Sequence, residues 1–242
     1  MRNIRLLLEY EGTNYQGWQS QENAGGIQDI LEEAIFKLTQ ETVRVVAAGR
    51  TDSGVHARGQ VVNFHLQKEL PVNKIYMGLN AYLPRDIVVK NSEVAAPDFN
   101  SRFDAKQRIY QYFIYFERTA IYRNLCWQLF SKIDTQIIFP LAEIILGEHD
   151  FSSFCRLETQ TNHKKCQVFE SSWRWENDFL IYRIGANRFL HGMVRTLVGT
   201  MTEVGRGKLA PDQFSVILQA KDRNQAGNTA PARGLFLEQV VY

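Results

Sequence analysis

Hydrophobic and polar residues alternate at the start of the chain, from residue 3 to residue 10. Ile4, Leu6 and Leu8 fall on one side of an extended chain, because successive side chains of a strand point to opposite faces. We therefore predict a first strand that is buried on one side. The apolar run reaches Glu9 after only three leucines, which is too soon for a signal peptide.

A helical period follows in the first half. Apolar residues recur every three or four positions from Ile27 to Leu38, as in an amphipathic helix packed on a sheet. The next segments predict strands at 43–49 and 60–66, a helix at 72–82 that ends before Pro84, and a strand at 87–89. The order strand, helix, two strands, helix, strand is that of the ferredoxin-like split βαβ unit.

The second half repeats this order. Its predicted elements are a strand at 108–116, a helix at 140–146 with Pro140 in its first turn, a hairpin of 168–175 and 179–184 across Asn177-Asp178, helices at 190–201 and 214–218, and a strand at 235–242. We expect an α+β protein with an N-terminal domain, 1–105, and a C-terminal domain, 106–242. The two ferredoxin-like halves would join into one extended, mostly antiparallel sheet with helices on one face. The opposite face would be free to form a cleft.

Composition narrows the class of protein. The 242 residues are 45% hydrophobic and 22% charged, as in a soluble globular chain, and no apolar run approaches the ~18 residues of a membrane span. The three cysteines and five histidines have no metal-ligand spacing. We expect a cytoplasmic protein with free thiols and without metal or cofactor. Residues 106–242 carry 17 Lys/Arg against 13 Asp/Glu, a mild indication of a polyanionic partner.

One predicted loop between two strands, 48–57, holds the candidate chemistry. It reads AGRTDSGVHA and contains Arg50, Asp52 and His56 together with two glycines. Local composition alone favours an ordinary turn, in which Asp52 or Ser53 bonds the following backbone. A loop with these side chains on a rigid sheet is also a common place for catalysis.

The longer segment 48–64, AGRTDSGVHARGQVVNF, resembles the catalytic segment of the tRNA pseudouridine synthase A (TruA) family. Three further segments resemble the same family in the same order: 10–21, YEGTNYQGWQSQ; 102–112, RFDAKQRIYQY; and 187–195, NRFLHGMVR. The region 220–237 also fits through AKDR and GLFL. Several ordered matches are far more specific than one short motif.

The resemblance implies that Asp52 is the nucleophile and that Arg195 is the cation beside it. An aspartate in a partly desolvated pocket needs such a cation to stay ionised, and a guanidinium can hold it with two parallel hydrogen bonds. At helical spacing, Arg195 would share a helix face with Arg188 and His191.

The remaining site residues also follow from the resemblance. The tyrosine that matches Tyr110 stacks on the target base and is a candidate general base, and the arginine that matches Arg50 holds the target nucleotide outside the stack. We place His56 and Arg188 with Arg50 and Tyr110 among the substrate-binding residues. Tyr15 and Trp18, in the first loop, fit a base-stacking surface and the edge of the core equally well.

The reaction implied is uridine to pseudouridine at positions 38, 39 and 40 of the tRNA anticodon stem-loop, by a homodimer. The C1′–N1 bond breaks and uracil is reattached through C5. Asp52 would attack C1′ or C6, or would assist a glycal route, and the sequence leaves these open. Extrusion of the target base costs a few kcal/mol, which an aromatic platform and an arginine wedge would offset.

Two departures from the family pattern stand out. Gly192 occupies a position where many members have histidine, and Cys166, after Lys164 and Lys165, one where members often have arginine. An RNA contact at the second position would have moved to a lysine.

Two other functions fit the sequence less well. A ferredoxin-like RNA-binding module without catalysis usually shows a basic-aromatic strand signature, which this chain lacks. A hydrolase that uses Asp52 with a second carboxylate would need a partner at recognisable spacing, and none is found.

Overall fold

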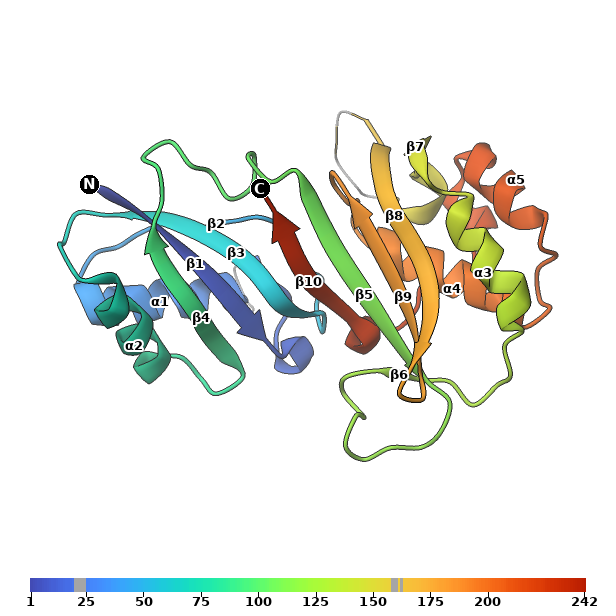
Figure 1. Cartoon of the computed structure of the whole chain (residues 1–242), viewed down its shortest axis with the longest axis horizontal. Helices are drawn as coiled ribbons and strands as arrows, with labels where there is room; N and C mark the ends of the chain where they lie inside the picture. Colours follow the sequence, from blue (N-terminus) through green and yellow to red (C-terminus); the bar gives the residue numbers. More distant parts are fainter. Residues whose placement is uncertain (20–24, 158–160, 162) are drawn as a thin grey trace. The chain divides into compact units, whose positions relative to one another are not determined.

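The computed structural model describes residues 1–19, 25–157, 161 and 163–242. Ser20 and Gln21, at the end of the first matched loop, lie outside the described residues. The chain divides into two compact units, Met1–Lys106 with Phe236–Tyr242, and Gln107–Leu235 (Figure 1). The first of these is unit 1 and the second is unit 2.

Unit 1 is an α+β layer built on a short sheet. Its elements are β1 (Arg2–Tyr10), η1 (Gly12–Asn14), α1 (Ile27–Thr39), β2 (Val46–Ala47), β3 (His56–Leu66), α2 (Val72–Tyr82), β4 (Ile87–Val94) and most of β10 (Leu235–Val241). The strand order is β4-β1-β3-β10, with β2 beside β3. β1 runs antiparallel to both neighbours, and β10 runs parallel to β3. The predicted order of strands and helices in the first half is therefore confirmed.

Packing in unit 1 follows the alternation seen in the sequence. Ile4, Leu6 and Leu8 are fully buried. The helices α1 and α2 lie against each other, so closely that a Cβ on Gly78 would come within 2.5 Å of Leu38 Cδ1.

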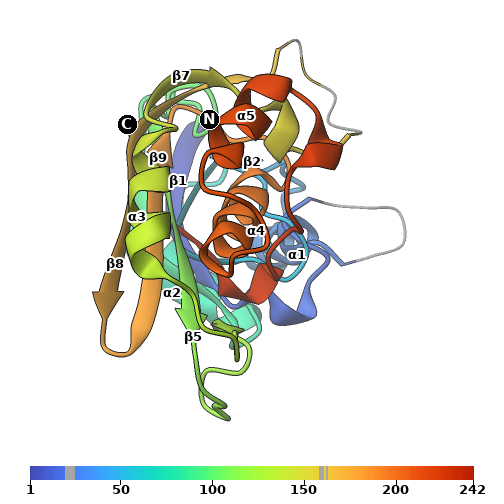
Figure 2. The same cartoon turned by 90° about the vertical axis from the view of Figure 1, so that its right-hand side faces the viewer.

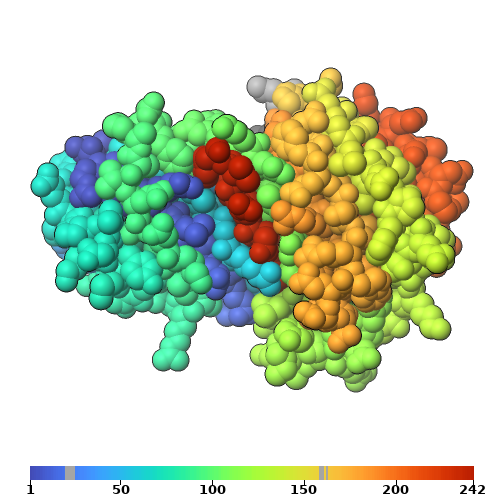
Figure 3. Space-filling model, viewed as in Figure 1, coloured from blue at the N-terminus to red at the C-terminus, as the bar shows by residue number. Residues whose placement is uncertain are grey.

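The last strand closes unit 1, although the sequence analysis had assigned it to the C-terminal half. Phe236 pairs with His56 and Leu237 with Ala57, and the red surface of β10 lies next to the cyan of β3 in Figure 3. A Cβ on Gly59 would come within 2.3 Å of Glu238 O, so a glycine is required where β10 meets β3.

Unit 2 is also α+β. Its elements are β5 (Gln107–Tyr115), β6 (Trp127–Gln128), α3 (Thr135–Glu143), β7 (Gly147–Asp150), η2 (Ser152–Phe154), β8 (Lys165–Glu176), β9 (Phe179–Ala186), α4 (Met193–Gly205), α5 (Gln213–Ala220), η3 (Arg223–Gln225) and η4 (Ala232–Gly234). The order β5-β9-β8-β7 is antiparallel throughout, and the short β6 runs parallel to β5. The α+β class and the mostly antiparallel pairing are confirmed, and the predicted hairpin turns at Asn177-Asp178, both at positive φ.

Helix α3 differs from its predicted bounds, 140–146. The carboxylate of Asp134 caps the helix by accepting a hydrogen bond from the Gln136 N–H at 3.0 Å, which fixes the start well before Pro140. Pro140 lies inside the helix instead of in its first turn. The residues after Glu143 leave the helix and lead into β7 at Gly147, which has a φ of +95°.

Helix α4 covers one side of the unit 2 strands (Figure 2). Trp173, on β8, donates a hydrogen bond from Nε1 to Met201 Sδ of α4 at 3.5 Å. Trp173 pairs with Tyr182 of β9, which pairs with Tyr112 of β5, so all three side chains point toward α4. Among the described residues, no helix is both long and apolar enough to cross a membrane.

Candidate active site

The loop that carries Asp52 connects β2 to β3 and is tied along its first half to β3. Ala48 N donates to Val61 O at 2.9 Å, and the buried Gln60 donates from Nε2 to Gly49 O at 2.7 Å. Past these anchors Arg50 is exposed and Asp52 is partly exposed. The carboxylate therefore lies on a short loop whose entry is fixed by the sheet.

The second half of this loop is held by the loop that follows β1. Trp18 N donates to Thr51 O at 3.0 Å, and Gly54 N and Ser53 Oγ donate to Tyr15 O at 3.3 and 3.2 Å. The bonds at Thr51 and Ser53 are made by the two residues that flank Asp52. The position of Asp52 is thus set mainly through bonds of the neighbouring backbone.

Two glycines make this contact between backbones possible. A Cβ on Gly12 would lie 2.0 Å from Val55 O, and a Cβ on Gly17 would lie 2.6 Å from Thr51 O. Gly17 also has a φ of +94°, which favours glycine. The role of these two glycines was not predicted, although both stand in the first segment that resembles the family.

The aromatic residues of the first loop belong to the core. Trp18 is 2% exposed and Tyr15 is 8% exposed, so neither offers a base-stacking surface. The hydroxyl of Tyr15 donates to Asp86 Oδ1. Below the loop, Tyr10 OH and Thr51 Oγ1 are 2.8 Å apart, and burial raises the pKa of Tyr10 to about 12. Tyr10 is therefore neutral and supports the residue before Asp52.

His56 is fully buried at the start of β3. Its Nδ1 accepts a hydrogen bond from Gly12 N at 3.0 Å, and its ring stacks on Phe236 with centroids 4.6 Å apart. A ring without exposed surface does not contact a nucleic acid directly, which differs from the predicted substrate contact. Its position suits a residue that holds the Asp52 loop in place.

Tyr110 lies on β5 in unit 2 and is 6% exposed. Its position two residues before Tyr112 puts it on the face that carries α4, and its ring meets the edge of Phe189 at 5.0 Å between centroids. We predicted a cleft on the face opposite the helices, but Tyr110 lies on the face that α4 covers.

Arg195 is the third residue of α4 and is partly exposed. Its Nε donates to Ala230 O at 2.8 Å, and Ala230 N donates back to Arg195 O at 3.0 Å. The strand-like segment around Ala230 approaches α4 closely, since a Cβ on Gly199 would lie 1.7 Å from Asn228 O. Ala230 thus fixes the direction of the guanidinium, a role that no sequence signal revealed.

Arg188 and His191 do not share a helix face with Arg195, contrary to the prediction. The helix begins only at Met193, because Gly192 precedes it with a φ of +75°. Arg188 lies before that break, where its Nη2 donates to Thr161 Oγ1 at 2.8 Å. The departure from histidine at 192 therefore coincides with a left-handed residue that favours glycine.

At the second departure from the family pattern, Cys166 and the neighbouring Lys165 both make contacts within unit 2. Cys166 is buried, and burial raises the pKa of its thiol to about 12. Lys165 pairs with Glu148 at 3.2 Å.

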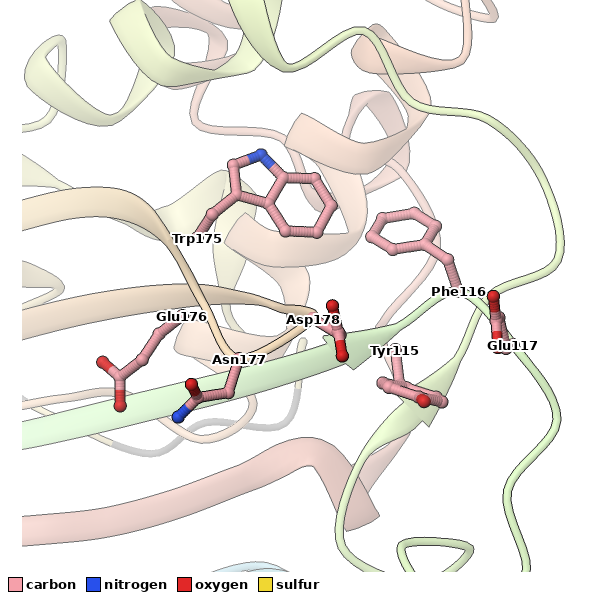
Figure 4. Close-up of a pocket in the computed structure, with 7 residues that line it drawn as sticks. All are labelled: Tyr115, Phe116, Glu117, Trp175, Glu176, Asn177 and Asp178. Carbon is pink, nitrogen blue, oxygen red and sulfur yellow. The ribbon is translucent and has the colours of Figure 1, made fainter.

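A cavity of about 540 Å³ in unit 2 lies apart from these residues. Figure 4 shows its lining at the end of β5 and the tip of the β8–β9 hairpin: Tyr115, Phe116, Glu117, Trp175, Glu176, Asn177 and Asp178. Three of these seven side chains are carboxylates, which would repel a phosphate backbone. Within the described residues, no group of three or more His, Cys, Asp or Glu side chains could hold a metal ion.

Comparisons with known proteins agree with the motifs. A family model described as tRNA pseudouridine synthase matches residues 7–104 and 141–242. Curated proteins named tRNA pseudouridine synthase A are similar over the whole chain: 43% identity with that of Caldicellulosiruptor saccharolyticus and 40% with that of Clostridium acetobutylicum, each covering 100% of both chains. The protein of that name from Francisella tularensis subsp. novicida is 39% identical over 100% of this chain and 95% of its own.

Proposed function

Because the chain belongs to the tRNA pseudouridine synthase family, we propose that it converts uridine to pseudouridine at positions 38, 39 and 40 of the tRNA anticodon stem-loop, with Asp52 as the nucleophile. The observation that carries this proposal is the loop of Asp52. Its carboxylate is partly exposed, while the backbone on both sides of it is bonded to buried structure. A nucleophile must be reachable and also held in place.

The reaction is an isomerisation that needs no external reagent. The N1–C1′ bond of uridine breaks, uracil turns within the site, and a C5–C1′ bond forms. The proton on C5 leaves, and N1 takes up a proton, so the overall composition is unchanged. Asp52 supplies the transient partner for the nucleoside, at C1′ or C6 or through a glycal route.

We assign to Arg195 the task of keeping Asp52 ionised and oriented. Its Nε is held by Ala230 O, which orients the guanidinium, and a planar guanidinium suits the bidentate pairing with a carboxylate that arginine favours. The ion pair has to form for catalysis, since burial without a cation would protonate the carboxylate.

Tyr110 and Arg50 complete the proposed site. In this proposal Tyr110 stacks on the extruded uracil and takes the proton from C5, and Phe189 supports its ring. Arg50 is exposed two residues before Asp52, which suits a residue that keeps the target nucleotide out of its stack. Arg188 contributes a positive charge to substrate binding, and His56 positions the loop. We extend the proposal to a homodimer that acts on tRNA in the cytoplasm.

The test uses an unmodified tRNA transcript and carbodiimide mapping of the product. Wild-type protein should give pseudouridine at positions 38 to 40 where uridine occurs there. Asp52→Ala should give none while binding the transcript about as well as the wild type. Asp98→Ala, which removes an exposed carboxylate elsewhere in unit 1, serves as the control and should be fully active.

Two outcomes would contradict the proposal. Pseudouridine formed by the Asp52→Ala variant would remove Asp52 from the chemistry, and product at other tRNA positions alone would reject the anticodon stem-loop as substrate. Sedimentation equilibrium tests the homodimer separately, and a monomer at working concentration would reject that part alone.

A further inference from the structure

The short turn 100–104 in unit 1 is anchored next to the start of the Asp52 loop. The fully buried Ser101 donates from Oγ to Val46 O of β2 at 2.7 Å, and its N–H donates to the Oδ1 of buried Asn63 at 2.9 Å. Tyr242 adds a third bond, from its hydroxyl to Ser101 O at 2.8 Å. The centre of the turn is therefore fixed to the sheet.

The turn is also rigid within itself. The Oδ1 of Asn100 accepts hydrogen bonds from Arg102 N at 3.0 Å and from Phe103 N at 3.1 Å. Asp104 N donates to Asn100 O at 3.0 Å, and Asp104 Oδ2 accepts from Asn100 N at 2.8 Å. Side chains on such a turn project in a defined direction, so their exposure is built into the structure.

The two residues that the turn presents are an aromatic ring and a cation. Phe103 is 77% exposed, and Arg102 is exposed beside it with its Cζ 5.7 Å from the centre of the phenyl ring. A single exposed apolar residue is ordinary. A phenyl ring held outward by a fixed turn, with a guanidinium at its side, is the combination that binds single-stranded RNA.

This turn lies close to Arg50. Val46, which anchors Ser101, precedes Arg50 by four residues, so the extended chain separates them by at most about 14 Å. Partial desolvation lowers the pKa of Arg50, and the guanidinium groups of Arg102 and Arg44 lower it further, so both groups lie near Arg50, although Arg44 is also paired with Glu32 at 3.1 Å. Gathered guanidinium groups attract a phosphate.

We propose that Arg102 and Phe103 bind the RNA strand next to the nucleotide held at Asp52. Arg102 together with Arg50 takes a backbone phosphate, and the phenyl ring of Phe103 stacks on an unpaired base that flanks the target. This assignment rests on the proposed function and names a second point of contact for the same substrate. Stacking on Phe103 would favour binding of an anticodon stem-loop, whose loop nucleotides are already unpaired, over binding of a continuous duplex.

The test compares Phe103→Leu, Phe103→Trp and Arg102→Ala with two controls at other exposed positions of unit 1, Phe36→Leu and Arg85→Ala. The Kd for an anticodon stem-loop RNA is measured at several salt concentrations, and kcat and KM are measured for pseudouridine formation. Phe103→Leu should raise Kd about tenfold, with a larger change in KM than in kcat, and Phe103→Trp should restore binding. Arg102→Ala should lower the slope of log Kd against log salt by about 0.7.

The inference fails if Phe103→Leu and Arg102→Ala match the controls in Kd and in salt slope, or if they lower kcat while KM is unchanged. That result would leave the proposed function intact, provided that the wild type forms pseudouridine. A wild type that forms none would reject the proposed function, and the Kd measurements would still decide whether this surface binds the RNA.

Discussion

His56 Nδ1 accepts a hydrogen bond from the backbone N–H of Gly12 at 3.0 Å, and this bond joins the first residue of β3 to the loop after β1. Both groups are buried. If this hydrogen bond were broken, water could not reach either group to replace it. The bond holds the two loops together on one side of Asp52, while the backbone bonds at Thr51 and Ser53 hold them on the other.

Replacement of His56 tests this relationship. His56→Leu should lower the free energy of unfolding by about 1–3 kcal/mol, because it leaves the Gly12 N–H without a partner in the interior. His56→Asn can accept the same bond and should lose less. Urea denaturation measures both variants, and equal losses would mean that ring packing on Phe236, not the hydrogen bond, is what matters.

Gly17→Ala should damage catalysis more than binding. The new Cβ would meet Thr51 O at 2.6 Å, at a φ of +94°, so the backbone next to Asp52 has to move. A misplacement of about 1 Å can cost a hundredfold in rate. We expect kcat to fall by about that factor, with tRNA affinity near the wild-type value. Gly25→Ala is the control, because its Cβ would meet no described atom within 4 Å; a similar loss there would contradict the argument.

Arg195→Lys separates charge from geometry. Lysine keeps the positive charge but cannot donate to Ala230 O and to a carboxylate in one plane. The expected result is a loss in kcat of about a hundredfold or more, with a smaller change in tRNA affinity. Arg206→Lys, at the exposed end of the same helix, should be harmless. Full activity of Arg195→Lys would show that charge alone suffices, and full activity of Arg195→Ala that another cation serves Asp52.

Stability should fall in alkaline solution in part because of Cys166. Burial raises the pKa of its thiol from 9.0 to about 12, so the folded state keeps a proton that the unfolded state releases above about pH 9. The stabilisation is complete below about pH 9 and is lost as the pH rises toward about 12, by at most about 1.4 kcal/mol per pH unit.

Cys166→Val provides the comparison for this effect. The valine cannot ionise, so the unfolding free energy of the variant should decline less steeply between about pH 9 and about pH 11 than that of the wild type. Parallel curves in urea denaturation would show that Cys166 does not contribute to the alkaline loss.

Most strands and helices could be predicted from periodicity and turn chemistry. Alternation in 3–10 and the turn at Asn177-Asp178 depend on local sequence, and both are confirmed. The starts of two helices were not predicted correctly. The start of α3 is set by the cap at Asp134, and the start of α4 by the left-handed Gly192, and each of these outweighs the apolar pattern around it.

The candidate site, too, could be predicted from the sequence only in part. The motif around Asp52 could be identified from its residues, because its resemblance to one family is long. The supports could not, because they are contacts with backbone groups: Gly17 against Thr51 O, and the Arg195 Nε with Ala230 O. The burial of His56 was also hidden, since it depends on Phe236, which is 180 residues away in the chain.

The return of the last strand to unit 1 has a consequence for biosynthesis. Phe236 stacks on His56, and β10 pairs with β3, so the unit that carries Asp52 lacks a strand until residues 235–241 have been synthesised. Unit 1 therefore cannot complete its sheet during synthesis before the residues of unit 2 have been made.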